Sequence, residues 1–103
     1  MDQIPAAQVN WKKRVGKIDD AEVWALSTVG GLNLVVKSLR GGKTEVLGAG
    51  PHRAIARHIA ERQNPSIVWT TLEKGEHFPV ETFEWLIPEA EAMTKALRNA
   101  QGF

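Results

Sequence analysis

The sequence predicts a single α+β domain: an antiparallel β-meander of three to four strands, followed by a helix, a strand and a second helix. Three observations lead to this fold class. Asp-Asp and Gly-Gly pairs separate short runs rich in β-branched and aromatic residues in the first half of the chain. Two later segments carry apolar residues at helical spacing. The chain of 103 residues has the size of one domain, so we expect both helices to pack on one face of the sheet.

The expected strands are separated by turns. They cover residues 14–18, 22–29, 32–39 and 44–47. Asp19-Asp20 is typical of a turn because Asp accepts hydrogen bonds from nearby backbone groups. Gly30-Gly31 fits a two-residue hairpin turn in which both central residues need a positive φ, and Gly41-Gly42 marks the next hairpin. Consecutive hairpins predict a mainly antiparallel sheet.

The first helix is expected from Pro51 to about Gln63. Pro51 has a φ preset for a first helical position, and Asn64-Pro65 ends the segment. Its apolar stripe, which we expect to face the sheet, consists of Ile55, Ala56, Ile59 and Ala60.

The remainder of the chain predicts one more strand and more helix. Residues 66–72 read as a strand, which pairs in parallel with a meander strand or lies at an edge of the sheet. A short helical piece is expected at 81–86 and the last helix at 88–100. The apolar stripe of that last helix consists of Ala90, Met93, Ala96, Leu97 and Ala100.

The N-terminal residues and the composition predict the setting of the domain. Residues 1–10 show no clear period and include Pro5, so we expect a flexible tail there and a single domain at 11–103. The chain has no cysteine, which excludes disulfides and thiolate metal sites. It shows neither a signal-peptide pattern at its start nor an apolar run near the roughly 20 residues of a membrane-spanning helix. We therefore expect a soluble cytoplasmic protein.

The segment from Gly48 to Arg53 is the most suggestive local feature. A glycine-rich turn that leads from a strand into a helix N-terminus presents backbone N–H groups to anions. The segment matches neither the dinucleotide-binding nor the Walker glycine pattern, and Pro51 removes one donor. A tight connection that needs glycine for its backbone angles is the favoured interpretation, and anion binding is the alternative.

No pattern in the chain predicts catalysis. The serines Ser27, Ser38 and Ser66 lack the Gly-x-Ser-x-Gly setting of a hydrolase nucleophile. His52 and His58 are six residues apart and therefore lie about 240° apart around a helix, so they cannot chelate one ion together. We expect a protein that is not an enzyme and that uses neither a metal nor another cofactor.

The charges are unevenly distributed along the chain. Residues 1–62 hold ten Lys and Arg against six Asp and Glu, whereas residues 63–103 hold three against six. Such polarity favours a charged partner or head-to-tail association of copies. The basic residues that could contact an anion or a nucleic acid are Lys12, Lys13, Arg14, Arg53 and Arg57. A pI of about 8.1 lies below the range typical of nucleic-acid-binding domains, which makes that function the alternative.

Aromatic residues provide the leading functional hypothesis. Trp24 and Trp69 share strand faces with aliphatic residues and are expected to anchor the core. The residues expected to bind a partner are Trp11, Phe78, Phe83 and Trp85. The proline-interrupted segment 77–88 either packs on the core or forms a docking surface. We expect a small regulatory binding module that acts through protein–protein contact or self-association. The alternative is a nucleic-acid-binding regulator; no membrane contact is expected.

Overall fold

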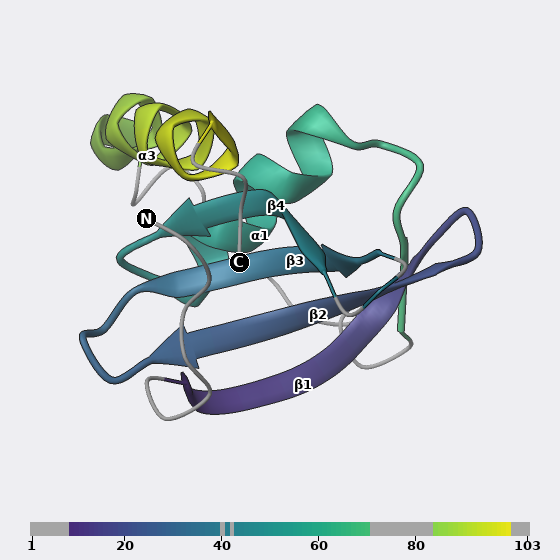
Figure 1. Ribbon diagram of the computed structural model, residues 1–103. Helices are drawn as coiled ribbons and strands as arrows, with labels where there is room; N and C mark the ends of the chain where they lie inside the picture. Colours follow the sequence, from purple (N-terminus) through teal and green to yellow (C-terminus); the bar gives the residue numbers. More distant parts are fainter. Residues whose placement is uncertain (1–8, 40, 42, 71–83, 100–103) are drawn as a thin grey trace.

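The computed structural model describes residues 9–39, 41, 43–70 and 84–99, with side chains from Lys12 onward. These residues form a five-stranded sheet and two helices (Figure 1). The elements are β1 (Val9–Ile18), β2 (Ala21–Thr28), β3 (Asn33–Ser38), β4 (Thr44–Gly50), α1 (Arg53–Gln63), β5 (Val68–Trp69) and α3 (Ile87–Asn99). The predicted α+β class of a small single domain is confirmed.

The sheet is a meander to which one later strand is added. Its order is β4-β3-β2-β1-β5, and every neighbouring pair is antiparallel. The four-stranded meander is therefore confirmed. β5 joins the edge beside β1, where Trp69 pairs with Gly16 and Val68 with Lys17. Of the two expected placements of this strand, the structure therefore shows the edge position and not a parallel pairing. Residues 71 and 72 of the expected strand lie outside the described residues.

β1 starts earlier than the sequence predicts. It begins at Val9, which pairs with Thr28, and not at Arg14. Residues 9 and 10 thus belong to a strand and not to a tail, while residues 1–8 lie outside the described residues. The basic run that starts at Lys12 interrupts the alternation of apolar and polar residues, so the pattern alone does not mark this strand.

The prediction of a two-residue turn at Gly30-Gly31 is wrong. The N–H of Thr28 donates to the carbonyl of Leu32 at 2.9 Å, which leaves a three-residue loop between them. Of its two glycines, Gly31 alone has a positive φ, at 88°. This geometry is typical of three-residue hairpin loops, in which a left-handed residue follows a type I turn. The Asp19-Asp20 turn is confirmed by the pairing of Ile18 with Ala21.

The glycines of β4 make room for α1. β4 continues through Gly48 to Gly50, beyond the expected end at Leu47. A Cβ atom at Gly48 would overlap the carbonyl oxygen of Ala56, and one at Gly50 would lie 2.7 Å from Cγ2 of Ile55. Neither glycine has a positive φ, so close helix packing, and not backbone angles, accounts for both residues.

The two helices pack on different side chains of the sheet. Ala56 and Ala60 of α1 belong to a core cluster with Val23, Ala25 and Val35. Met93 and Leu97 of α3 pack against a cluster with Leu34 and Val36, beside Trp24 and Leu26. Successive strand residues point to opposite faces of a sheet, so the two helices lie toward opposite faces. The expectation that both helices cover one face is not confirmed.

The expected helical stripes are correct for α1 and partly correct for α3. α1 begins at Arg53, two residues after Pro51, and all four stripe residues are buried. In α3, Ala90 is buried, Met93 and Leu97 are half-buried and Ala96 is exposed; residue 100 lies outside the described residues. The two helices meet beyond β4, where a third cluster joins Ile55, Ile59, Leu86, Ile87 and Ala90.

Thr94 attaches α3 to the edge of the sheet. Its buried hydroxyl accepts a hydrogen bond from the N–H of Ala49 at 3.0 Å and donates one to the carbonyl of Ala90 at 2.7 Å. β4 is an edge strand, so without Thr94 this N–H would lose its partner. A polar residue thus completes the packing of α3 on β4.

Candidate functional site

Trp85 is the most exposed tryptophan in the described part of the chain. Its exposed fraction is 73%, whereas Trp69 is buried and Trp24 is half-buried. Residues 84–86 form a single helical turn immediately before α3. Leu86 and Ile87 enter the cluster between the helices and fix this turn, so that Trp85 points to solvent. Within this segment, Leu86 and Ile87 therefore belong to the core, whereas Trp85 lies on the surface.

Two acidic residues flank Trp85 along the chain. Glu84 precedes it, and Pro88 and Glu89 follow at the spacing of one helical turn; all three are exposed. The name Trp85 surface is used below for Glu84, Trp85, Pro88 and Glu89. A large aromatic side chain within acidic groups is suited to a partner that offers apolar contact and positive charge.

The other predicted anchors are not brought together by the described residues. Phe78 and Phe83 lie outside them. Trp11 lies in β1, where its backbone pairs with Ser27, and its side chain is not described. β1 and α3 lie at opposite edges of the meander (Figure 1). The roles of Trp11, Phe78 and Phe83 stay predictions.

The predicted basic residues fall into two groups. Lys12 and Arg14 are both exposed and point to the same face of β1, since they pair with Leu26 and Trp24 of β2. Lys17 lies opposite Glu22 and is also exposed. Lys13 pairs with Ala25 and so points to the face on which α1 packs. The name basic face of β1 is used below for Lys12, Arg14 and Lys17.

The side chains on this face contact one another. Nζ of Lys12 lies 5.9 Å from the ring centroid of Trp24. Nε1 of Trp24 donates to a carboxylate oxygen of Glu22 at 3.1 Å, and Arg14 lies 3.6 Å from the other oxygen. Glu22 therefore offsets one of the positive charges, and the face remains basic. Trp24 is held within this group and packs on Leu34 and Val36.

Arg53 and Arg57 do not extend the basic face. Arg57 is 7% exposed, and its guanidinium carbon lies 4.5 Å from the ring centroid of Trp69. Stacking on the ring of Trp69 explains why the Arg57 side chain is buried. Its role in anion binding stays a prediction. Arg53 is the first residue of α1. Gly48 and Gly50, which precede it in β4, are buried against the helix. Burial of these glycines favours the packing interpretation of this segment over an anion-binding turn.

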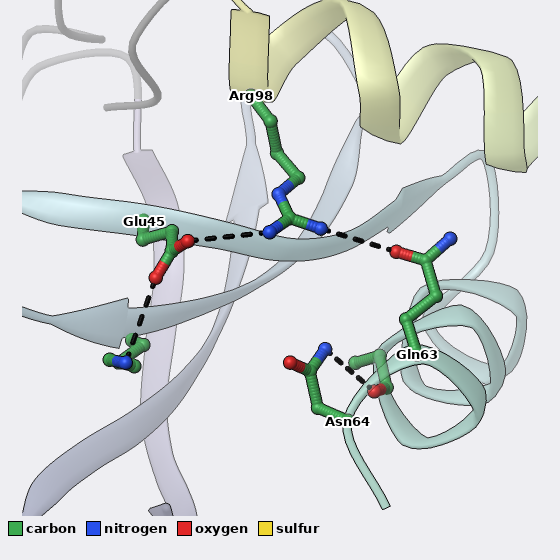
Figure 2. Close-up of polar contacts among 6 residues, drawn as sticks. Glu45, Gln63, Asn64 and Arg98 are labelled. Atoms are coloured by element: carbon green, nitrogen blue, oxygen red, sulfur yellow. Dashed lines mark hydrogen bonds and ion pairs between the residues drawn. The ribbon is translucent and has the colours of Figure 1, made fainter.

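The sequence reasoning missed a polar cluster where both helices end. Figure 2 shows Arg98 of α3 between Glu45 of β4 and Gln63 of α1, with distances of 3.3 and 3.4 Å. Nζ of Lys37 lies 3.7 Å from the other carboxylate oxygen of Glu45. An open cleft of about 820 Å³ is lined by Glu45, Gln63 and Arg98. The partners in the cluster are up to 53 residues apart, so no local pattern indicates them.

The described residues bring no group of three His, Asp or Glu side chains close enough to hold a metal ion. Neither described helix has the length and apolar character that are needed to cross a bilayer. Comparisons with known proteins add no assignment: no family model, no curated protein and no solved structure matches this chain. The assignment of a function to these candidate sites therefore has to come from their geometry and chemistry.

Proposed function

We propose that this protein is a small, non-catalytic binding module that regulates a cytoplasmic protein partner by docking through Trp85. The observation that carries this proposal is the 73% exposure of Trp85 beside two buried aliphatic residues. Burial of a tryptophan removes about 150–250 Å² from water, so a partner that covers Trp85 gains this apolar contact. Tryptophan is also enriched among the residues that contribute most to interface affinity.

A matched pair of variants tests this proposal. Val29 is 71% exposed in the turn between β2 and β3, so Val29→Ala removes an exposed apolar side chain that is not part of the Trp85 surface. Tagged wild type, Trp85→Ala and Val29→Ala are used to capture cross-linked proteins from cells. We expect one partner to be retained by wild type and Val29→Ala and lost from Trp85→Ala. Equal capture by all three proteins would contradict the proposal.

A second function, nucleic-acid binding, is favoured by one observation. Lys12 and Arg14 flank the half-buried Trp24 on one sheet face, and single-strand binders combine basic side chains with aromatic rings on such faces. Elution from heparin at increasing salt tests this function, because phosphate contacts lose affinity steeply as salt rises. Lys12→Ala is expected to elute earlier than wild type if this function holds, and Lys43→Ala is the control.

A further inference from the structure

We propose that the partner of the Trp85 surface is a second copy of this chain, which receives it on the basic face of β1. This inference rests on the proposed function, since it assigns an occupant to the same surface. It predicts head-to-tail association, in which each copy offers its Trp85 surface to one neighbour and its basic face to another.

The two surfaces lie at opposite edges of the molecule. α3 packs on β4, which is one edge of the sheet, and β1 is three strands away in the order β4-β3-β2-β1. Three strand spacings correspond to about 14 Å. Figure 1 shows α3 beside β4 at the top of the view and β1 at the bottom. A single copy therefore presents the two surfaces at separate edges, so that each surface can meet a different neighbour.

The charges of the two surfaces are complementary. Glu84 and Glu89 are exposed and form no ion pair within the described part of the chain. On the basic face, Arg14 is paired with Glu22, whereas Lys12 and Lys17 present exposed ammonium groups. Trp85 also suits a basic surface, because ammonium and guanidinium groups bind over indole rings. The net charge of the chain is only +1, so repulsion between copies is weak.

The symmetry of the contact follows from the separation of the two surfaces. A two-fold dimer can join two unlike groups of residues only when both lie within one continuous interface, whereas surfaces at separate edges of the chain make a heterologous contact. Such a contact closes into a ring or continues as an open chain. Association is therefore expected to pass beyond the dimer as concentration rises, and added salt is expected to weaken it.

Charge-reversal variants test whether the partner is a second copy of this chain and not a different protein. The first variant carries Glu84→Lys and Glu89→Lys, and the second carries Lys12→Glu and Lys17→Glu; Arg14 is kept to preserve its pair with Glu22. Each variant alone presents two surfaces of the same sign, whereas a mixture restores opposite signs at every contact. The control variants are Glu61→Lys and Lys43→Glu, at exposed positions outside both surfaces.

Sedimentation velocity over a concentration series is the measurement, with circular dichroism to verify folding. Wild type is expected to exceed the dimer mass at low salt, and each reversed variant to associate at least about tenfold more weakly. The mixture of the two variants is expected to recover the wild-type mass, and the controls to behave as wild type. Trp85→Ala, which removes no charge, is expected to remain monomeric.

The failures of the two proposals are distinguishable. Monomeric wild type at every concentration overturns self-association, while capture of another protein that depends on Trp85 preserves the proposed function. Association that is lost in Trp85→Ala but is insensitive to both charge reversals overturns the basic face as the docking site. Wild type that stays monomeric and shows no capture dependent on Trp85 overturns both proposals.

Discussion

The two edges of the sheet are built differently. At β4, α1 packs against one side of the strand, and α3 binds its outer edge through Thr94. At β1, the described residues supply only β5, which pairs with Gly16 and Lys17. The cluster between the two helices lies at the first edge. At the second edge, Val15, Ile18 and Trp69 enter the core on one face, and the opposite face of β1 carries exposed Lys and Arg side chains. The comparison indicates that the packing of both helices is concentrated at β4, which leaves the basic face of β1 available for charged contacts.

The largest expected effect lies at the β4 edge. Ile59 is fully buried between α1 and the start of α3. Ile59→Ala is expected to lower the free energy of unfolding by about 2–5 kcal/mol, because it opens a cavity that the helices cannot fill. Urea unfolding measures the change, and Ile59→Val, expected to cost about 0.5–1.5 kcal/mol, is the control. No change in either variant would show that the helices contribute little at this edge.

A second substitution tests the close approach of α1 to β4. Gly48→Ala is expected to lower the free energy of unfolding by about 1–3 kcal/mol, since the added methyl group forces the helix away from the strand. Gly30→Ala is the matched control, because its Cβ would meet nothing closer than Oγ1 of Thr28 at 3.9 Å. Equal thermal stability of the two variants would contradict the packing role of Gly48.

The hydrogen bond of the edge strand can be tested separately. Thr94→Val keeps the volume of the side chain but leaves the N–H of Ala49 buried without its partner. We expect a loss of about 1–3 kcal/mol in stability and faster amide exchange at Ala49. Thr94→Ser retains the hydroxyl and is expected to preserve the protection of that amide. Unchanged exchange in Thr94→Val would mean that α3 does not protect this edge.

Local patterns predicted those elements that local interactions define. The stripe of α1 and the hairpin order follow from periods of 3.6 and 2 residues, and the structure confirms them. The role of Thr94 and the pair of Arg98 with Glu45 depend on residues 45 and 53 positions apart, and the face that α3 covers depends on residues that are farther apart still. No local period records such distances. The early start of β1 escaped prediction because its central residues are basic on both faces.

The residues of the candidate site could be predicted from the sequence, but which of their side chains face solvent could not. The sequence singled out Trp85, yet Trp85, Leu86 and Ile87 form one apolar run in which no period decides which side chain is buried. The packing of α1 against α3 decides it, by drawing Leu86 and Ile87 inward. Arg57 shows the opposite case, because a residue expected at the surface stacks on Trp69 in the interior.

The smallest expected change in stability belongs to Trp85→Ala, and its neighbour provides the control. Trp85 is 73% exposed and Leu86 is 7% exposed, although the two residues are adjacent. Removing the tryptophan side chain is expected to change the free energy of unfolding by no more than about 0.5 kcal/mol, as for other surface substitutions. Leu86→Ala is expected to cost about 2–5 kcal/mol, because its side chain fills the cluster between the helices. Urea unfolding at a concentration where wild type is monomeric measures both values without a contribution from association. A loss in Trp85→Ala as large as that in Leu86→Ala would assign Trp85 to the core and remove the anchor on which the proposed contact depends.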